Sequence, residues 1–239
     1  MKIIMIYDQI QAGAGIKDDH MVPLGAKKQA VGPAVMMERF LKQVDGRVVA
    51  CLYCGDGTYA ENPDEVSRKL CAMINKLKPD MVMCGPCFNY LGYGKMAARV
   101  AYDLTQKTDV PAFAAMSVEN EETIAEYKDK IHIVKTPKKG GTGLNEALEG
   151  MCLLADAMVN NKDEDQVAQK YCFYKLKGCF HKHPFSLRIN IYQFEEGGNK
   201  YVGNYRNMAY GCRRNHRSKP YVRKRRRCSR CYRNCNPCC

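Results

Sequence analysis

The chain has 239 residues and a formal net charge of +13. Residues 171–239 hold 17 Lys and Arg but 2 Asp and Glu, so the positive charge belongs to that segment and the first 170 residues are slightly acidic. A basic surface for nucleic acid is therefore not expected on the first part of the chain. The start MKIIMIYDQI lacks the apolar core and cleavage site of a signal peptide. No run approaches the roughly 18 apolar residues of a membrane helix, so we expect a cytoplasmic protein with reduced thiols and no membrane partner.

Apolar runs and helical periods alternate along the first 160 residues. The runs predict strands at residues 2–7, 48–53, 80–84, 110–116 and 131–135. Helical spacing of apolar residues predicts helices at residues 34–44, 62–77 and 144–158, and one more after Gly94. The second helix has a clear start, because Asn62 can cap it, Pro63 suits its first position and Glu65 completes a capping-box pattern.

This alternation predicts an α/β fold. Strands joined by helices form a parallel sheet with helices on both faces, so we expect a doubly wound, mainly parallel five-stranded sheet of the flavodoxin or Rossmann type. We place this domain at residues 1–165 and a basic Cys- and Arg-rich tail at residues 166–239. The tail has few acids and no sustained apolar period, so we expect it to be poorly structured or the product of a shifted reading frame.

Three Gly-rich and polar loops follow predicted strands, where open parallel sheets bind their ligands. They are residues 54–62, 85–94 and 139–143. Cys87 follows a strand and precedes a helix, a position that can lower the pKa of a thiol, although a buried Cys more often serves as a small hydrophobic residue. Asn89 could bind a carboxylate or amide, and Tyr93 could close over it. The glycines at 140–143 resemble a phosphate-binding loop only loosely.

Cysteine spacing leaves other functions open. Cys51 and Cys54 form a Cys-x-x-Cys pair, as do Cys84 and Cys87, but one member of each lies inside a predicted strand, which disfavours a redox or metal role. His20 and His132 have no evident partners. In the tail, two Cys-x-x-Cys pairs at 228–231 and 235–238 are too close together for a zinc ribbon. A small-ligand-binding domain with a nucleic-acid- or zinc-binding tail is the alternative function, although we expect no metal and consider nucleic acid unfavoured.

Two of the loops resemble a known family. The runs CGDGTYAEN at residues 54–62 and CGPCFNYLGYG at residues 84–94 resemble the selenoprotein subunit of component B of glycine/sarcosine/betaine reductase. The opening strand, the helix start at residues 31–33 and the strand end at residues 134–136 fit the same family. The resemblance covers about residues 1–160.

The resemblance implies a role in the reductive deamination of glycine or an N-methylated glycine to acetyl phosphate. In this family a partner component B subunit carries a pyruvoyl group that forms a Schiff base with the substrate amine. A selenocysteine then takes the carboxymethyl group, which passes to a small selenoprotein called component A, and component C releases acetyl phosphate. The resemblance thus implies an oxidoreductase, with a disulfide as acceptor, in anaerobic amino-acid fermentation.

This chain departs from the family pattern. Family members are about twice as long, and their selenocysteine lies in a second half to which nothing here corresponds. We therefore expect an N-terminal fragment of the subunit that holds no cofactor, has no catalytic residue of its own and is inactive without partners. The residues expected to contact substrate or another subunit are Gly55, Asp56, Asn62, Gly85, Pro86, Cys87, Asn89, Tyr93 and Gly94.

Overall fold

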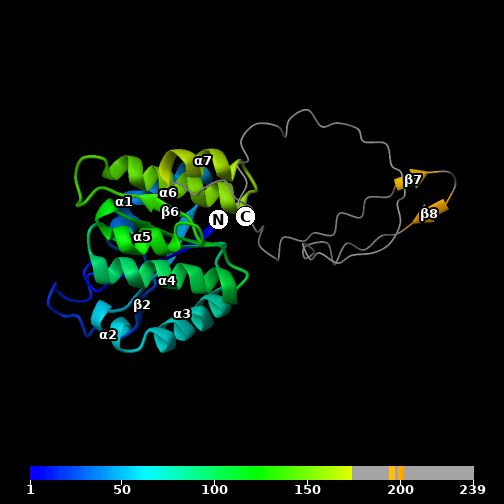
Figure 1. Cartoon of the computed structure of the whole chain (residues 1–239). Coiled ribbons are helices and arrows are strands. Elements are labelled where there is room, and N and C mark those ends of the chain that lie inside the picture. The colour runs from blue at the N-terminus through cyan, green and yellow to red at the C-terminus, as the bar shows by residue number, and fades with distance from the viewer. Residues whose placement is uncertain (174–193, 197–198, 202–239) are drawn as a thin grey trace, which may run out of the picture. The chain divides into compact units, whose positions relative to one another are not determined.

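The computed structural model describes residues 1–173, 194–196 and 199–201 (Figure 1). The chain divides into two units, residues 1–186 and residues 187–239. In the second unit, strands β7 (Phe194–Glu196) and β8 (Asn199–Tyr201) pair antiparallel. Residues 166–173 of the predicted tail belong to the first unit, where they complete the helix Glu164–Tyr171 and follow it, so the boundary predicted at residue 165 falls inside that helix. The remaining predictions for the tail, including its two Cys-x-x-Cys pairs, fall on residues outside the described ranges.

The first unit contains a six-stranded sheet. Its strands are β1 (Lys2–Tyr7), β2 (Gly25–Lys27), β3 (Arg47–Tyr53), β4 (Met81–Cys84), β5 (Ala112–Met116) and β6 (Ile133–Lys135). Their order across the sheet is β2-β3-β1-β4-β5-β6, and every neighbouring pair is parallel except β2 with β3. The α/β class and the mainly parallel sheet are confirmed, but the prediction of five strands is wrong by one.

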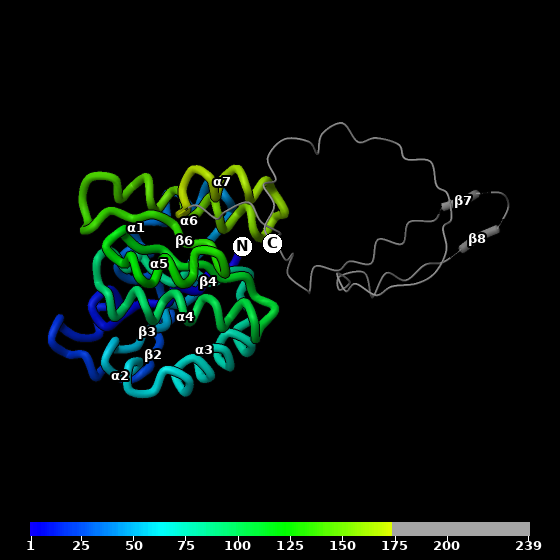
Figure 2. The backbone as a smooth tube through the Cα atoms, in the orientation of Figure 1, coloured from blue at the N-terminus to red at the C-terminus, as the bar shows by residue number. Residues whose placement is uncertain are grey.

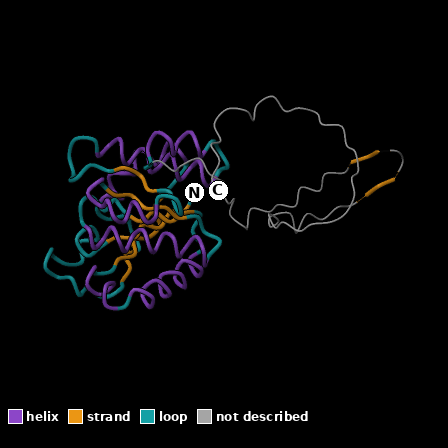
Figure 3. Tube along the Cα trace, viewed as in Figure 1, coloured by secondary structure: helices purple, strands orange, loops and turns teal. Residues whose placement is uncertain are grey.

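Two layers of helices enclose the sheet (Figure 3). The helices are α1 (Pro33–Leu41), α2 (Asp56–Glu61), α3 (Pro63–Leu77), α4 (Leu91–Lys107), α5 (Glu121–Tyr127), α6 (Leu144–Val159) and α7 (Glu164–Tyr171), with short 3-10 turns η1 (Lys42–Val44) and η2 (Val118–Asn120). Helices α1 and α7 both pack against α6, whereas α2, α3 and α5 pack against α4. Among the described residues, no helix has the length and apolar content that crossing a bilayer requires.

The apolar runs form the core as expected. Side chains from Ile3 to Tyr7 are at most 1% exposed, because β1 lies in the middle of the sheet and is covered on both faces. Burying one such aliphatic side chain contributes about 2 kcal/mol to stability. The central strands and the helices packed over them therefore fix where the loops at each end of the sheet must lie.

One helix start differs from the prediction. Asn62 occupies the position before α3 and Pro63 is its first residue, but the Asn62 side chain makes no capping hydrogen bond. Glu65 pairs instead with Lys69 one turn later, at 2.7 Å. The capping-box prediction is therefore wrong, and the helix begins because Pro63 fixes the backbone for its first turn.

Candidate functional site

The three segments predicted as loops follow β3, β4 and β6, at the edge of the sheet where its parallel strands end. The loop predictions are too long, because residues 56–61 form helix α2 and residues 91–94 begin helix α4. The segment between β1 and β2 lies at the same edge. The chain order of the strands reverses beside β1, because β3 lies on one side of it and β4 on the other. In open α/β sheets such a reversal leaves a crevice between two neighbouring loops, and ligands bind in it. We call this end of the sheet the carboxyl edge; it lies on the left of Figure 2, where the chain leaves β1.

The loop from Gly85 to Tyr90 is held in place by its neighbours. Gly85 adopts φ +134°, and a Cβ atom there would lie 2.6 Å from the Ala115 carbonyl oxygen, so the position requires glycine. The carbonyl of Phe88 accepts three hydrogen bonds, from the backbone N–H of Ser117 at 3.0 Å, the Ser117 hydroxyl at 2.8 Å and the amide of Asn120 at 2.7 Å. This loop is therefore fixed to the segment after β5.

Cys87 is a buried residue of that loop. Its N–H donates to the Ala115 carbonyl at 2.8 Å, and its side chain is inaccessible to solvent. Burial raises the pKa of the Cys87 thiol well above its ordinary value, with further contributions from Cys84 and Asp8, while a hydrogen bond with Tyr93 opposes the rise. The thiol is therefore protonated at neutral pH, and the lowered pKa that its position could give is not found.

Tyr93 is also buried. Its hydroxyl donates to the Ile6 carbonyl at 2.8 Å, which ties the start of α4 to β1. Pro86 lies inside the same loop and is buried as well. Tyr93 therefore lies under the carboxyl edge, and its proposed contact with a substrate stays a prediction.

Asp8 is a buried carboxylic acid at the crevice that the sequence analysis did not identify. It follows β1 directly, is 2% exposed and accepts a hydrogen bond from the Gln11 N–H at 2.6 Å. Burial raises the pKa of Asp8 to about 6, opposed by that hydrogen bond and reinforced by the charge of Asp56. A carboxyl group whose pKa approaches neutrality at a ligand-binding edge is suited to exchange protons. An acidic residue directly after the first buried strand was the available signal.

Asp56 joins the segment after β1 to the loop after β3. One of its carboxylate oxygens lies 2.6 Å from the His20 ring and accepts from the Gly57 N–H at 3.1 Å and the Gln9 amide at 3.4 Å. The hydrogen bond and the negative charge of Asp56 raise the pKa of His20 above its ordinary value. The expectation that His20 has no partner is therefore wrong; His132 likewise contacts a carboxylate, that of Glu164.

The remaining predicted residues are only partly brought together. A Cβ at Gly92 would lie 2.7 Å from Asp56, and one at Gly94 would lie 2.2 Å from the Asn120 side chain, so the two motif loops and the segment after β5 meet. Gly55 similarly lies against the His20 backbone. Asn89 is half-buried near this meeting point, whereas Asn62 is exposed at the far end of α2. The glycines at 140–143 form an exposed turn before α6.

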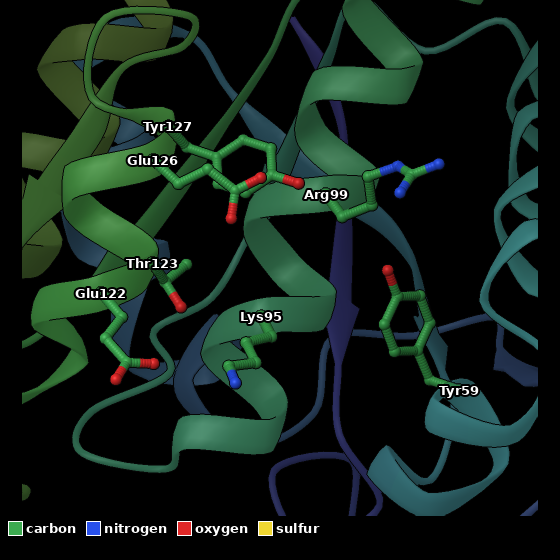
Figure 4. A pocket seen from close by; sticks show the side chains of 7 residues that line it. All are labelled: Tyr59, Lys95, Arg99, Glu122, Thr123, Glu126 and Tyr127. Atoms are coloured by element: carbon green, nitrogen blue, oxygen red, sulfur yellow. The ribbon is translucent and has the colours of Figure 1, made fainter.

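A separate cavity of about 350 Å³ opens on the helical face (Figure 4). Its lining comes from α2, α4 and α5: Tyr59, Lys95, Arg99, Glu122, Thr123, Glu126 and Tyr127. Arg99 is bound to Asp64 and to the buried Asp103, both at 3.1 Å. The charges of this cavity thus partly compensate one another, as in a solvated ion network.

The seven cysteines within residues 1–173 are buried, including both Cys-x-x-Cys pairs of that range. Six of them are free thiols: Cys51, Cys54, Cys71, Cys84, Cys87 and Cys152. Burial raises the pKa of Cys54 to about 11 and that of Cys152 to about 12. Within the described ranges, no cluster of three or more His, Cys, Asp or Glu side chains is arranged to hold a metal ion.

Comparison with known proteins gives a consistent result. A family model described as glycine/sarcosine/betaine reductase selenoprotein B matches residues 1–186. The sarcosine reductase complex component B subunit beta of Peptoclostridium acidaminophilum is 29% identical over 136 residues, which cover 57% of this chain and 31% of that protein. The glycine reductase complex component B subunit gamma of Symbiobacterium thermophilum is 25% identical over 202 residues, 84% of this chain and 43% of that protein. The chain thus spans 31% and 43% of the lengths of these two relatives. No solved structure matches it.

Proposed function

Because the chain belongs to the glycine/sarcosine/betaine reductase selenoprotein B family, we propose that it serves as part of a component B subunit in a reductase complex. The match over residues 1–186 carries this proposal, and the relatives named above are subunits of such complexes. The order β3-β1-β4-β5-β6 supports a doubly wound sheet of the flavodoxin type, whose ligand crevice lies beside the first strand.

The reaction we propose for the complex is the reductive deamination of glycine or an N-methylated glycine to acetyl phosphate in the cytoplasm. The pyruvoyl group that binds the substrate amine belongs to a partner component B subunit, and the small selenoprotein component A and the acetyl-phosphate-forming component C complete the system. No residue of this chain is assigned as the nucleophile, so the chain alone is proposed to be inactive.

Within this reaction, the carboxyl edge is proposed to contact the substrate or a neighbouring subunit. Asp56 lies where segments after different strands meet, Gly55 and Asn89 belong to two of these segments, and the nearby Asp8 adds a carboxyl group whose pKa approaches neutrality. Glycines at this edge let the segments approach one another closely. Such a surface can hold a small polar ligand or accept a loop of another subunit.

Association with a partner subunit tests this proposal. The full chain is mixed with the pyruvoyl-bearing component B subunit of the Peptoclostridium acidaminophilum sarcosine reductase, and complex formation is measured by sedimentation. We expect Asn89→Ala at the carboxyl edge to weaken the complex, while Asn75→Ala, an exposed asparagine of α3, leaves it unchanged.

Two results would count against the proposed function. One is a complete lack of association between the folded chain and the pyruvoyl-bearing subunit. The other is turnover of glycine or sarcosine by the purified chain in the absence of every partner, measured as acetyl phosphate formed.

A further inference from the structure

Large hydrophobic side chains that face solvent are gathered at the carboxyl edge. Ile16 and Met21, in the segment between β1 and β2, are 68% and 55% exposed. Val35 and Met36 are exposed in the first turn of α1, which begins beside the segment after β1. Scattered exposed hydrophobic residues are normal on a protein surface, but a group confined to one place indicates an interaction site.

The loops after the next two strands add to the same edge. Tyr90 and Leu91 precede and begin α4, with Leu91 57% exposed, and Val118 in η2 is 63% exposed. Of the large hydrophobic side chains exposed within residues 1–173, only Leu77 lies elsewhere. It is the last residue of α3, close to where β4 begins and therefore at the opposite edge. We call the seven residues at the carboxyl edge the apolar edge patch.

The contributing segments touch one another. A Cβ at Gly57 would lie 2.9 Å from the Met21 sulfur, which places Met21 against the start of α2. The Asp56 carboxylate lies 2.6 Å from the His20 ring on one side and against Gly92 on the other. His20 precedes Met21 and Gly92 follows Leu91, so both hydrophobic residues lie next to the neighbours of this carboxylate. The patch therefore surrounds the polar groups of the candidate site and does not form a separate face.

We infer that the apolar edge patch is the surface on which the rest of a component B subunit packs, and that this contact covers the crevice beside β1. The inference rests on the proposed function. The matched segments amount to 31% and 43% of the relatives' lengths, so most of each relative consists of polypeptide that this chain does not match. Apolar side chains around a ligand crevice are the contacts through which that polypeptide would exclude water from the crevice.

The test supplies the polypeptide that a relative has beyond the matched segment. The part of the Peptoclostridium acidaminophilum sarcosine reductase subunit that lies beyond its matched segment is added to the full chain, both as a separate protein and fused after Cys239. Amide hydrogen exchange is then followed in segments 13–22 and 88–92. We expect protection there to rise by about ten-fold or more when the added polypeptide is present.

Paired variants locate the contact. Met21→Asp combined with Leu91→Asp should abolish the added protection, because each places a charge in an apolar contact, whereas Leu77→Asp should leave it intact. Circular dichroism of each variant checks that the domain is folded. Since the fused form keeps the two parts together, weak affinity alone cannot hide the contact.

Three outcomes would overturn the inference. Protection could fail to rise in the fused protein, it could rise equally in the double variant, or the chain alone could form a dimer that the double variant disrupts, which would make a second copy the occupant. Binding to the pyruvoyl-bearing subunit is measured on the same samples. If that binding persists while protection fails, the proposed function stands and only this inference falls; if both fail, the proposed function falls too.

Discussion

The carboxyl edge and the interface between α3 and α4 both bury an aspartate, but the pKa values of the two carboxyl groups shift in opposite directions. At the interface, Asp103 is held by the Ser67 hydroxyl, Arg99 at 3.1 Å and Lys107 at 3.3 Å. Burial acts to raise the pKa of Asp103, but these partners outweigh it and the pKa lies below its ordinary value. At the edge, no cation of the described residues acts on Asp8, and its pKa rises to about 6.

The two aspartates therefore differ in role: the charge of Asp103 stabilises the structure, whereas Asp8 can change its protonation state. The interface uses its carboxylate to join two helices, so the group is committed to its partners. The edge is joined instead by backbone contacts and neutral hydrogen bonds around Gly85 and Phe88, which leave Asp8 free to change protonation. A buried group that the framework does not need is the more promising functional residue.

The strongest test of this contrast concerns the backbone contacts of the edge. Gly85→Ala should lower the free energy of unfolding by about 4 kcal/mol, because alanine is strained at φ +134° and its Cβ would overlap the Ala115 carbonyl. Gly140→Ala, in an open turn, should change it by no more than about 0.5 kcal/mol. Urea unfolding followed by circular dichroism measures both. Equal stabilities of the two variants would mean that the edge is not held by close backbone packing.

The next largest loss of stability is expected when the Asp103 carboxylate between α3 and α4 is removed. Asp103→Ala should cost about 3 kcal/mol of unfolding free energy, since it leaves Ser67 and Arg99 without their buried acceptor. Asp109→Ala, an exposed aspartate, serves as the control in the same urea titrations. A loss below about 1 kcal/mol for Asp103→Ala, as for an exposed ion pair, would contradict the assigned structural role.

The two aspartates should also respond to pH in opposite directions. The folded chain binds the Asp8 proton more tightly than the unfolded chain, because the pKa is about 6 when folded and 3.8 ordinarily. Stability from this group is complete below pH 4 and is lost as the pH rises through 6, an effect of about 3 kcal/mol that Asp8→Asn should remove. For Asp103 the pKa is lowered, so its contribution is present above pH 4 and is lost as the pH falls below that value. Unfolding measured from pH 3 to 7 would show identical profiles for wild type and Asp8→Asn if Asp8 were not desolvated.

The smallest expected effect concerns the contact between Asp56 and the exposed His20 at the carboxyl edge. Asp56→Asn should lower the pKa of His20, because it removes the negative charge that the imidazolium faces at 2.6 Å. Little change in stability is expected, since His20 is exposed. Proton NMR of the His20 ring gives the titration midpoint directly. An unchanged midpoint would show that the two side chains do not interact in solution.

Sequence patterns predicted the parts of this fold that depend on burial. The five parallel strands are apolar runs, and the long helices carry apolar residues at helical spacing. The pattern missed β2, α2, α5 and α7, which are short or polar and are stabilised by what they pack against. Strand β2 consists of Gly25, Ala26 and Lys27, and the Lys27 ammonium holds it to the Ala12 carbonyl at 2.6 Å.

The sequence predicted Asp56 and the segments of the candidate site, but not Asp8 or the pairing of Asp56 with His20. Glycine, proline and asparagine at residues 54–62 and 85–94 identified two segments that follow β3 and β4, although residues 56–61 form α2 and Leu91 begins α4. In the sequence, Asp8 has the features of the first residue of a solvated loop. Its burial is not evident there, because it depends on which strands lie beside β1. His20 and Asp56 are 36 residues apart, and only the fold of the segment after β1 brings them together.

The two outermost strands of the sheet have a consequence for how molecules of this kind can assemble. Strand β2 is three residues long, and β6 on the other side is bridged to the chain at Cys172, where the Phe173 N–H donates to the Ile133 carbonyl at 2.9 Å. Within residues 1–173, therefore, neither border of the sheet offers a long row of open main-chain groups on which a foreign strand could add. Cross-β polymerisation is thus disfavoured at both borders.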